Sequence, residues 1–212
     1  MKVLLIGDSI RMFYQKEVIA QLGGDYEVFA PQENCRFSSY VLNSLRFWLN
    51  EFPIPDIIHF NVGLWDTAIL YHEDGCFIGL DEYIQNIKKI VRELKNTGAK
   101  IVFATTTPVS DEKEFLSGPM PPPHKNDDII KYNNALLKAL DGENIFINDL
   151  FSKMYPHKEQ YLSSDMIHPN EEGVKFLGKL VATAIKRCGV YKNKKDIISN
   201  RENIKKDEKT VQ

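Results

Sequence analysis

The sequence predicts an α/β protein with a five-stranded parallel sheet flanked by helices. Short apolar runs alternate with longer amphipathic stretches along most of the chain. Most of these runs lack the polar alternation of a half-solvated sheet, which is typical of strands covered on both faces. The length of 212 residues suits one domain of this class. The element order βαβαβαβαβα then implies right-handed crossovers.

Five compact apolar runs are the predicted strands. Ligands of open α/β sheets bind beyond the carboxyl ends of the strands, so the residues that follow each run are the first candidates for a functional site. The runs are Val3–Ile6, Glu27–Ala30, Asp56–Asn61, Lys100–Thr106 and Asn144–Asn148.

The best-marked helix is predicted to follow Pro169. Asn170 can cap its N-terminus, and apolar residues recur at helical spacing from Val174 to Cys188. Gly189 is expected at the C′ position, just beyond the last turn. The other predicted helices run from about Arg11 to Leu22, from Ser38 to Leu49, from an N-cap at Asp81 to near Gly98, and from Asp127 to Leu140.

Composition excludes several classes of protein. The chain has 27 Lys+Arg against 29 Asp+Glu, a net charge of −2, so a strongly basic nucleic-acid-binding surface is not expected. The three cysteines are far apart and form no CxxC motif, which argues against a disulfide framework or a zinc site. No apolar run is long enough for a signal peptide or a membrane helix, so we expect a cytoplasmic protein without a membrane partner.

A change in composition divides the chain near residue 190. Residues 1–190 are predicted to form the folded domain. Residues 191–212 form a charged C-terminal extension with 7 Lys+Arg and 4 Asp+Glu. Three roles stay open for this extension: a disordered tail, an added helix, or self-association into a homo-oligomer.

A serine stands where the first predicted strand meets the first helix, in Gly7-Asp8-Ser9. Unpaired backbone N–H groups and the positive end of a helix dipole would surround its oxygen there. Such a site can stabilise an oxyanion. The alternative is that Ser9 only caps the helix and Asp8 only shapes the turn, since both residue types are common helix starters.

An Asp and a His lie three residues apart in Asp165-Met166-Ile167-His168, followed by Pro169. The carboxylate can accept from one imidazole nitrogen, which leaves the other free to take a serine proton. The proline fixes the His backbone outside the helix that follows. The alternative is a capping loop with a solvated His.

Two more loops at strand ends hold polar groups. Asn61 and Gly63 follow the third strand, where the amide could donate to an oxyanion and the glycine allows close backbone approach. Asn34 and Arg36 follow the second strand and could face the same crevice. The alternatives are that Asn61 and Asp66 only organise their turn, and that Arg36 is a surface or loop-pinning residue.

On these residues the chain resembles the SGNH/GDSL family of serine esterases and lipases, over roughly residues 1–188. Gly7-Asp8-Ser9 matches the family's GDS block, and Asp165-x-x-His168 matches its D-x-x-H block. The resemblance implies a three-layer α/β/α sandwich with a flavodoxin-like sheet. It also implies that Ser9 is the nucleophile, His168 the general base and Asp165 its orienting group. No cofactor or metal is expected.

The resemblance is weaker at the oxyanion hole, which the family builds from the nucleophile's N–H, a glycine N–H and an Asn side chain. The family's G-x-N-D block reads Gly63-Leu64-Trp65-Asp66 here, with Trp at the Asn position. Asn61 is the nearest amide and the preferred donor beside the Ser9 N–H, and Trp65 is the alternative. The second block lacks its glycine at Asn34-Cys35-Arg36, which leaves that donor open.

The implied reaction is hydrolysis of a carboxylic ester, with a small-molecule ester as the substrate. Small polar acyl esters such as O-acetylated sugars are favoured over long lipids, because the sequence indicates no extended apolar groove and no membrane-binding helix. The expected substrate-binding residues are Asp8, Arg36, Tyr71, Met120 and His124.

Two other interpretations remain. The imperfect oxyanion blocks would suit a non-catalytic binding module on the same fold. The second is a metal site, disfavoured because its residues would straddle a strand end and a loop. That site would use His59, Asp66, His72 and Asp74.

Overall fold

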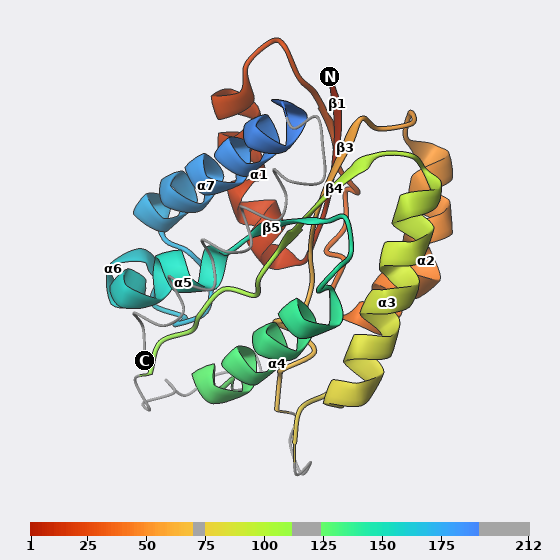
Figure 1. Ribbon diagram of the computed structural model, residues 1–212. Coiled ribbons are helices and arrows are strands. Elements are labelled where there is room, and N and C mark those ends of the chain that lie inside the picture. The colour runs from red at the N-terminus through yellow and green to blue at the C-terminus, as the bar shows by residue number, and fades with distance from the viewer. Residues whose placement is uncertain (70–74, 112–123, 191–212) are drawn as a thin grey trace.

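A five-stranded parallel sheet forms the centre of the computed structural model, which describes residues 1–69, 75–111 and 124–190 (Figure 1). The strand order is β2-β1-β3-β4-β5, and each neighbouring pair is parallel. This confirms the predicted fold class. The strands are β1 (Lys2–Ile6), β2 (Glu27–Phe29), β3 (Ile57–Asn61), β4 (Lys100–Ala104) and β5 (Phe146–Asn148).

Helices cover both faces of the sheet, because successive side chains of a strand point to opposite sides. Val3 and Leu5 of β1 belong to one apolar core, and Leu4 and Ile6 belong to the other. The first core packs under α1 (Ser9–Leu22) and α7 (Glu171–Val190), on the left in Figure 1. The second packs under α2 (Ser38–Glu51), α3 (Leu80–Asn96) and much of α4 (Asn126–Ala139).

The last helix begins as predicted but ends differently. Asn170 Oδ1 accepts the Gly173 N–H at 3.0 Å, which is the expected cap. Gly189 lies inside α7 and not at C′, so that prediction is wrong. The reason is visible at Lys100 of β4, whose Nζ donates to the carbonyl oxygens of Cys188 and Gly189 at 3.2 and 2.9 Å. A lysine thus satisfies the terminal carbonyls without a left-handed glycine.

Other boundaries differ by one or two residues for local reasons. The fourth strand ends at Ala104 because the backbone of Thr106 pairs with the side chain of Asn133, at 2.9 and 3.0 Å, and not with a strand. The third helix begins at Leu80 with Gly79 as N-cap, so Asp81 lies in the first turn. In the first turn its carboxylate still interacts favourably with the positive end of the helix dipole.

Three short helical segments separate β5 from α7 and were not predicted. Asp149 starts the first of them by accepting the Ser152 N–H at 3.1 Å. The segments carry the chain from the edge of the sheet to the turn that holds Asp165 and His168. They are α5 (Leu150–Met154), η1 (Tyr155–His157) and α6 (Lys158–Tyr161).

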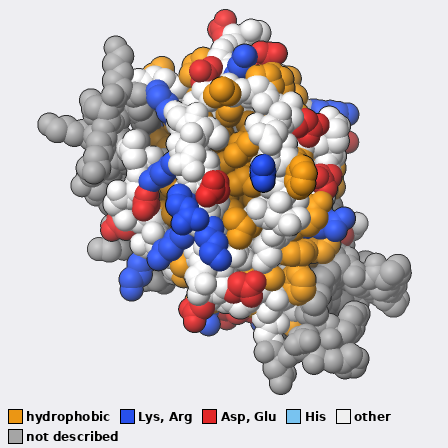
Figure 2. Space-filling model, turned by 90° about the vertical axis from the view of Figure 1, so that its right-hand side faces the viewer, with side chains coloured by type: hydrophobic (Ala, Val, Ile, Leu, Met, Phe, Trp, Pro, Cys, Tyr) orange, Lys and Arg blue, Asp and Glu red, His pale blue; other side chains and the backbone are white. Residues whose placement is uncertain are grey.

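The surface on the side of α2 and α3 mixes apolar side chains with charged ones (Figure 2). Within the described ranges, no helix has the length and apolar character needed to cross a bilayer. The predicted extension 191–212 lies outside the described residues.

Candidate active site

The turn between β1 and α1 leaves the Ser9 hydroxyl available. Asp8 is the N-cap of α1, and its Oδ1 accepts the Ile10 N–H at 3.0 Å. The capping role considered for Ser9 therefore belongs to its neighbour, and Ser9 is the partly exposed first residue of the helix. Gly7 is required here because a Cβ would lie 2.2 Å from Asn61 Oδ1.

The turn at residues 163–168 holds the Asp165 carboxylate in one orientation. Its Oδ1 accepts three hydrogen bonds, from the Ser163 hydroxyl at 2.8 Å and from the backbone N–H groups of Ile167 and His168 at 3.0 and 2.8 Å. Met166 has a left-handed φ of 64° and closes the turn by donating to the Ser163 carbonyl at 2.9 Å. The other carboxylate oxygen remains free to face the His168 ring.

A continuous hydrogen-bonded chain joins Asp165, His168 and Ser9. His168 Nδ1 lies 2.6 Å from Asp165 Oδ2, and His168 Nε2 lies 2.8 Å from Ser9 Oγ. Desolvation alone would raise the pKa of the Asp165 carboxyl, but the hydrogen bonds from His168, Ile167 and Ser163 outweigh it and lower the pKa to about 2. An ionised carboxylate only accepts, so Nδ1 donates to Asp165, and in the neutral form of the ring Nε2 offers a lone pair to Ser9.

Asn61 joins a buried polar network behind the serine. Its Nδ2 donates to Asp8 Oδ1 at 3.0 Å, and its Oδ1 accepts from the Tyr14 hydroxyl at 2.7 Å. Burial raises the pKa of Asp8 to about 6, although hydrogen bonds from Ile10 and Asn61 oppose the shift. With Asp8 only 2% exposed, its expected contact with substrate does not fit the structure.

The same network limits what Asn61 can do. The side chain is 5% exposed, and one hydrogen of Nδ2 remains beyond the bond to Asp8. Tyr14 was missed by sequence reasoning, since a tyrosine on the buried stripe of a helix has the same signature as a core residue.

The turn after β3 is built around Gly63 and Asp66. Gly63 has φ 148°, and a Cβ there would lie 2.2 Å from Thr106 Oγ1, so no other residue fits. Both carboxylate oxygens of Asp66 accept the Ser38 N–H at 3.1 Å, which caps α2 from outside the helix. Burial raises the pKa of Asp66 to about 7. Trp65 is partly buried in the same turn.

The metal alternative has no support within the described ranges, where no group of three or more potential ligands gathers. His59 is fully buried, and its Nε2 lies 3.2 Å from Asn148 Nδ2. Burial lowers the pKa of His59 to about 3. His72 and Asp74 lie outside the described residues.

The loop after β2 is organised by its own polar groups. Asn34 Oδ1 accepts the Arg36 N–H at 2.8 Å, and Arg36 has a left-handed φ of 52°. The exposed guanidinium of Arg36 stacks on Tyr40 of α2, 5.1 Å from the ring centre. Asn34 therefore organises this loop, and Arg36 contacts a helix of its own chain.

A buried arginine, missed from sequence, ties this loop to α1. Arg11 is 2% exposed, and its guanidinium donates to the Glu33 carbonyl at 2.5 Å and to Gln15 Oε1 at 2.6 Å. A charged residue in a helix usually indicates a solvated face, so no sequence signal pointed to it.

His124 reaches the turn after β3. Its Nδ1 lies 3.4 Å from Thr67 Oγ1, whose own proton goes to the Leu64 carbonyl at 2.9 Å. Burial lowers the pKa of His124 to about 4, with a smaller contribution from the charge of His168. The neutral ring therefore donates from Nδ1 and presents Nε2 as an acceptor. Tyr71 and Met120 lie outside the described residues.

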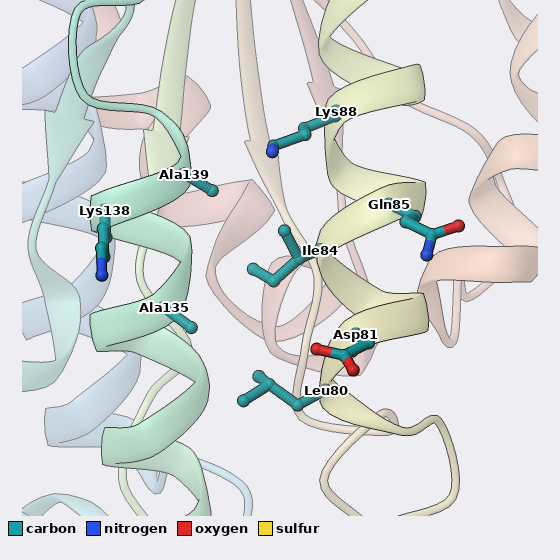
Figure 3. Close-up of a pocket in the computed structure, with 8 residues that line it drawn as sticks. All are labelled: Leu80, Asp81, Ile84, Gln85, Lys88, Ala135, Lys138 and Ala139. Carbon is teal, nitrogen blue, oxygen red and sulfur yellow. The ribbon is translucent and has the colours of Figure 1, made fainter.

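A groove of about 550 Å³ lies between α3 and α4 (Figure 3). Its lining contains neither Ser9, Asp165 nor His168, so it is separate from the site described above. The lining residues are Leu80, Asp81, Ile84, Gln85, Lys88, Ala135, Lys138 and Ala139.

Several solved structures share this architecture. The acetyl xylan esterase AlAXEase aligns with a TM-score of 0.67 at 18% identity, over 87% of this chain and 100% of its own. A lipase/acylhydrolase from Enterococcus faecalis aligns with a TM-score of 0.69 at 19% identity, over 87% and 95%. A catalytic mutant of an acetylxylan esterase from Geobacillus stearothermophilus aligns with a TM-score of 0.67 at 16% identity, over 90% and 94%.

No protein-family model and no curated protein sequence matches the chain. At these identities the structural likeness establishes the architecture alone. The chain therefore has the α/β/α fold of these esterases and acylhydrolases, which a structure named as a putative SGNH hydrolase from Slackia heliotrinireducens also shares.

Proposed function

We propose that the protein is a carboxylic ester hydrolase of the SGNH/GDSL type. The observation that supports this most directly is the chain from Asp165 through His168 to Ser9, with heavy-atom distances of 2.6 and 2.8 Å. These distances are those of a nucleophile paired with an oriented general base. A binding module would have no need for this alignment.

In the proposed reaction, Ser9 Oγ attacks the ester carbonyl carbon while His168 Nε2 takes the hydroxyl proton. Asp165 holds the imidazole and stabilises its cation. The tetrahedral intermediate collapses, the C–O bond to the alcohol breaks, and the alcohol leaves with the proton from His168. Water, activated by the same imidazole, then cleaves the acyl-enzyme and restores Ser9.

The oxyanion is proposed to bind the Ser9 N–H in the first turn of α1, where the helix dipole favours negative charge. The second proposed donor is the remaining Nδ2 hydrogen of Asn61. The indole N–H of Trp65 is the alternative second donor.

The proposed substrates are short acyl esters, acetyl groups on carbohydrate above all. Two of the compared structures are named as acetyl xylan esterases. His124 supports the same class, because an imidazole that presents an acceptor nitrogen suits a hydroxyl donor.

The test is turnover of p-nitrophenyl acetate, together with labelling by a fluorophosphonate. Ser9→Ala should lower turnover on the order of a millionfold and abolish labelling. Ser164→Ala alters an exposed serine in the Asp165–His168 turn and should behave as wild type. Absence of turnover and labelling in the folded wild-type protein would favour the binding module. Near wild-type activity in Ser9→Ala would reject the assignment of the nucleophile.

A further inference from the structure

We propose that Phe13 is a positioning residue for His168, which keeps the imidazole aligned with Ser9 and stabilises the imidazolium formed during the reaction. This inference rests on the proposed ester hydrolysis. Phe13 lies one helical turn after Ser9 on α1, so the two side chains project from the same face of the helix.

The Phe13 ring packs against the imidazole of His168. The ring centroids are 4.9 Å apart and the planes are inclined by only 27°, which is a stacked arrangement. Ser9 and Asp165 contact the two nitrogens at the ring edge, at 2.8 and 2.6 Å. Edge and face contacts together leave the imidazole little freedom to rotate away from the serine.

Packing of the core does not explain Phe13. Its side chain is 45% exposed, and it belongs to neither apolar cluster on the two faces of the sheet. A contact with a reacting group accounts for its position better than a structural role does.

The stack favours the charged form of the ring. The face of an aromatic ring carries negative charge density and attracts a cation above it. In the proposed reaction the imidazole of His168 gains a positive charge when it takes the Ser9 proton, so the attraction is stronger in the transition state.

Other charged groups also face His168 and must stay constant in any test. Asp165 contacts the ring directly, and Asp8 lies near enough to interact with its charge. His124 interacts with the same charge from the loop before α4. Substitution at Phe13 changes none of these groups, so a shift in titration can be assigned to the stack.

The experiment compares wild type with Phe13→Leu, Phe13→Trp and Met12→Ala. The pH dependence of kcat/KM for p-nitrophenyl acetate is measured, and the His168 Cε1–H resonance is titrated by NMR. Met12 is the matched control, since it is 43% exposed on the same helix and outside the proposed machinery.

Phe13→Leu should lower kcat about 3- to 10-fold and move the acidic midpoint to lower pH by about half a pH unit, the size expected for a partly exposed cation–π contact. Phe13→Trp should move the midpoint to higher pH, and Met12→Ala should leave both quantities unchanged. A drop in kcat without a shift of the midpoint, or a shift to higher pH in Phe13→Leu, would overturn the proposal.

The NMR titration needs no turnover and separates the two proposals. If wild type shows no esterase activity but the midpoint still shifts in Phe13→Leu, the proposed reaction fails and the stabilisation by Phe13 stands. If wild type is active and no midpoint shifts, only the role of Phe13 fails.

Discussion

Asp165 and His168 are joined twice, once through the ring and once through the backbone. Asp165 Oδ2 lies 2.6 Å from His168 Nδ1, and Asp165 Oδ1 accepts the His168 backbone N–H at 2.8 Å. The two bonds fix the carboxylate relative to both the imidazole and the main chain. The D-x-x-H spacing achieves this because a tight turn brings residues i and i+3 together.

Asp165→Asn should lower kcat by about 10⁴-fold while leaving the fold intact. The amide introduced at position 165 can donate to His168 Nδ1 as well as accept from it, so it permits the imidazole tautomer with the proton on Nε2. In that tautomer Nε2 cannot accept the Ser9 proton. Kinetics with p-nitrophenyl acetate measure the loss, and circular dichroism checks the fold. A loss below about tenfold would show that the carboxylate does not control the tautomer.

The Asn61 amide can be tested as an oxyanion donor with two substitutions. Asn61→Ala removes the amide and should lower kcat about 100- to 1,000-fold with a smaller change in KM. Tyr14→Phe removes the hydroxyl that donates to Asn61 Oδ1 at 2.7 Å but keeps the amide N–H. Tyr14→Phe should lower kcat less than about tenfold.

Thermal unfolding of both variants separates a loss of the buried network from a loss of catalysis. A kcat for Asn61→Ala close to that of wild type would assign the second donor role to Trp65. Trp65→Phe would then be expected to lower kcat by the same factor.

The fold could be predicted because its evidence is local and repeated. Each strand is a short apolar run, and the order of runs and helices fixes a parallel sheet. The segments from α5 to α6 escaped prediction because helices of three to five residues are too short to show a helical stripe. The error at Gly189 arose because the partner of the helix end, Lys100, lies 89 residues away in sequence.

The candidate site also contains residues that the sequence could predict and residues that it could not. Ser9, Asp165 and His168 lie in short motifs that can be recognised along the chain, and the structure brings them within hydrogen-bonding distance. Tyr14 and Arg11 act through contacts with residues 47 and 22 positions away. Their roles depend on tertiary packing, which leaves no local pattern.

The proposed preference for short acyl groups predicts the outcome of a chain-length series. Activity that rises with chain length requires apolar surface that buries each added methylene, worth about 0.8 kcal/mol apiece. The groove between α3 and α4 does not include Ser9 in its lining, so an acyl chain on Ser9 is not expected to gain from it.

We therefore expect kcat/KM to be highest for the acetate or butyrate ester of p-nitrophenol and to fall for octanoate and longer esters. Ser9→Ala supplies the blank for spontaneous hydrolysis. A maximum at long chains would refute the preference.

Asp66 should make the folded protein less stable as pH rises. Its pKa is raised by burial to about 7 in the folded state, against an ordinary value of 3.8. The folded protein therefore holds a proton that the unfolded chain has released between these values. The resulting stabilisation is fully present below about pH 4 and is lost as pH rises through about 7. Asp165 has the opposite pH dependence because its pKa is lowered: its stabilisation is lost only as pH falls below about 4.

Asp66→Asn stays neutral at every pH, while its side-chain oxygen can still accept the Ser38 N–H. The drop in the free energy of unfolding from pH 5 to pH 8 should thus be smaller than in wild type by about 2–3 kcal/mol. Urea denaturation at the two pH values measures it. Asp25→Asn changes an exposed carboxylate and should keep the wild-type drop. An equal drop in Asp66→Asn and wild type would mean that Asp66 is already ionised at pH 5, and that the Ser38 N–H stabilises the charge despite its burial.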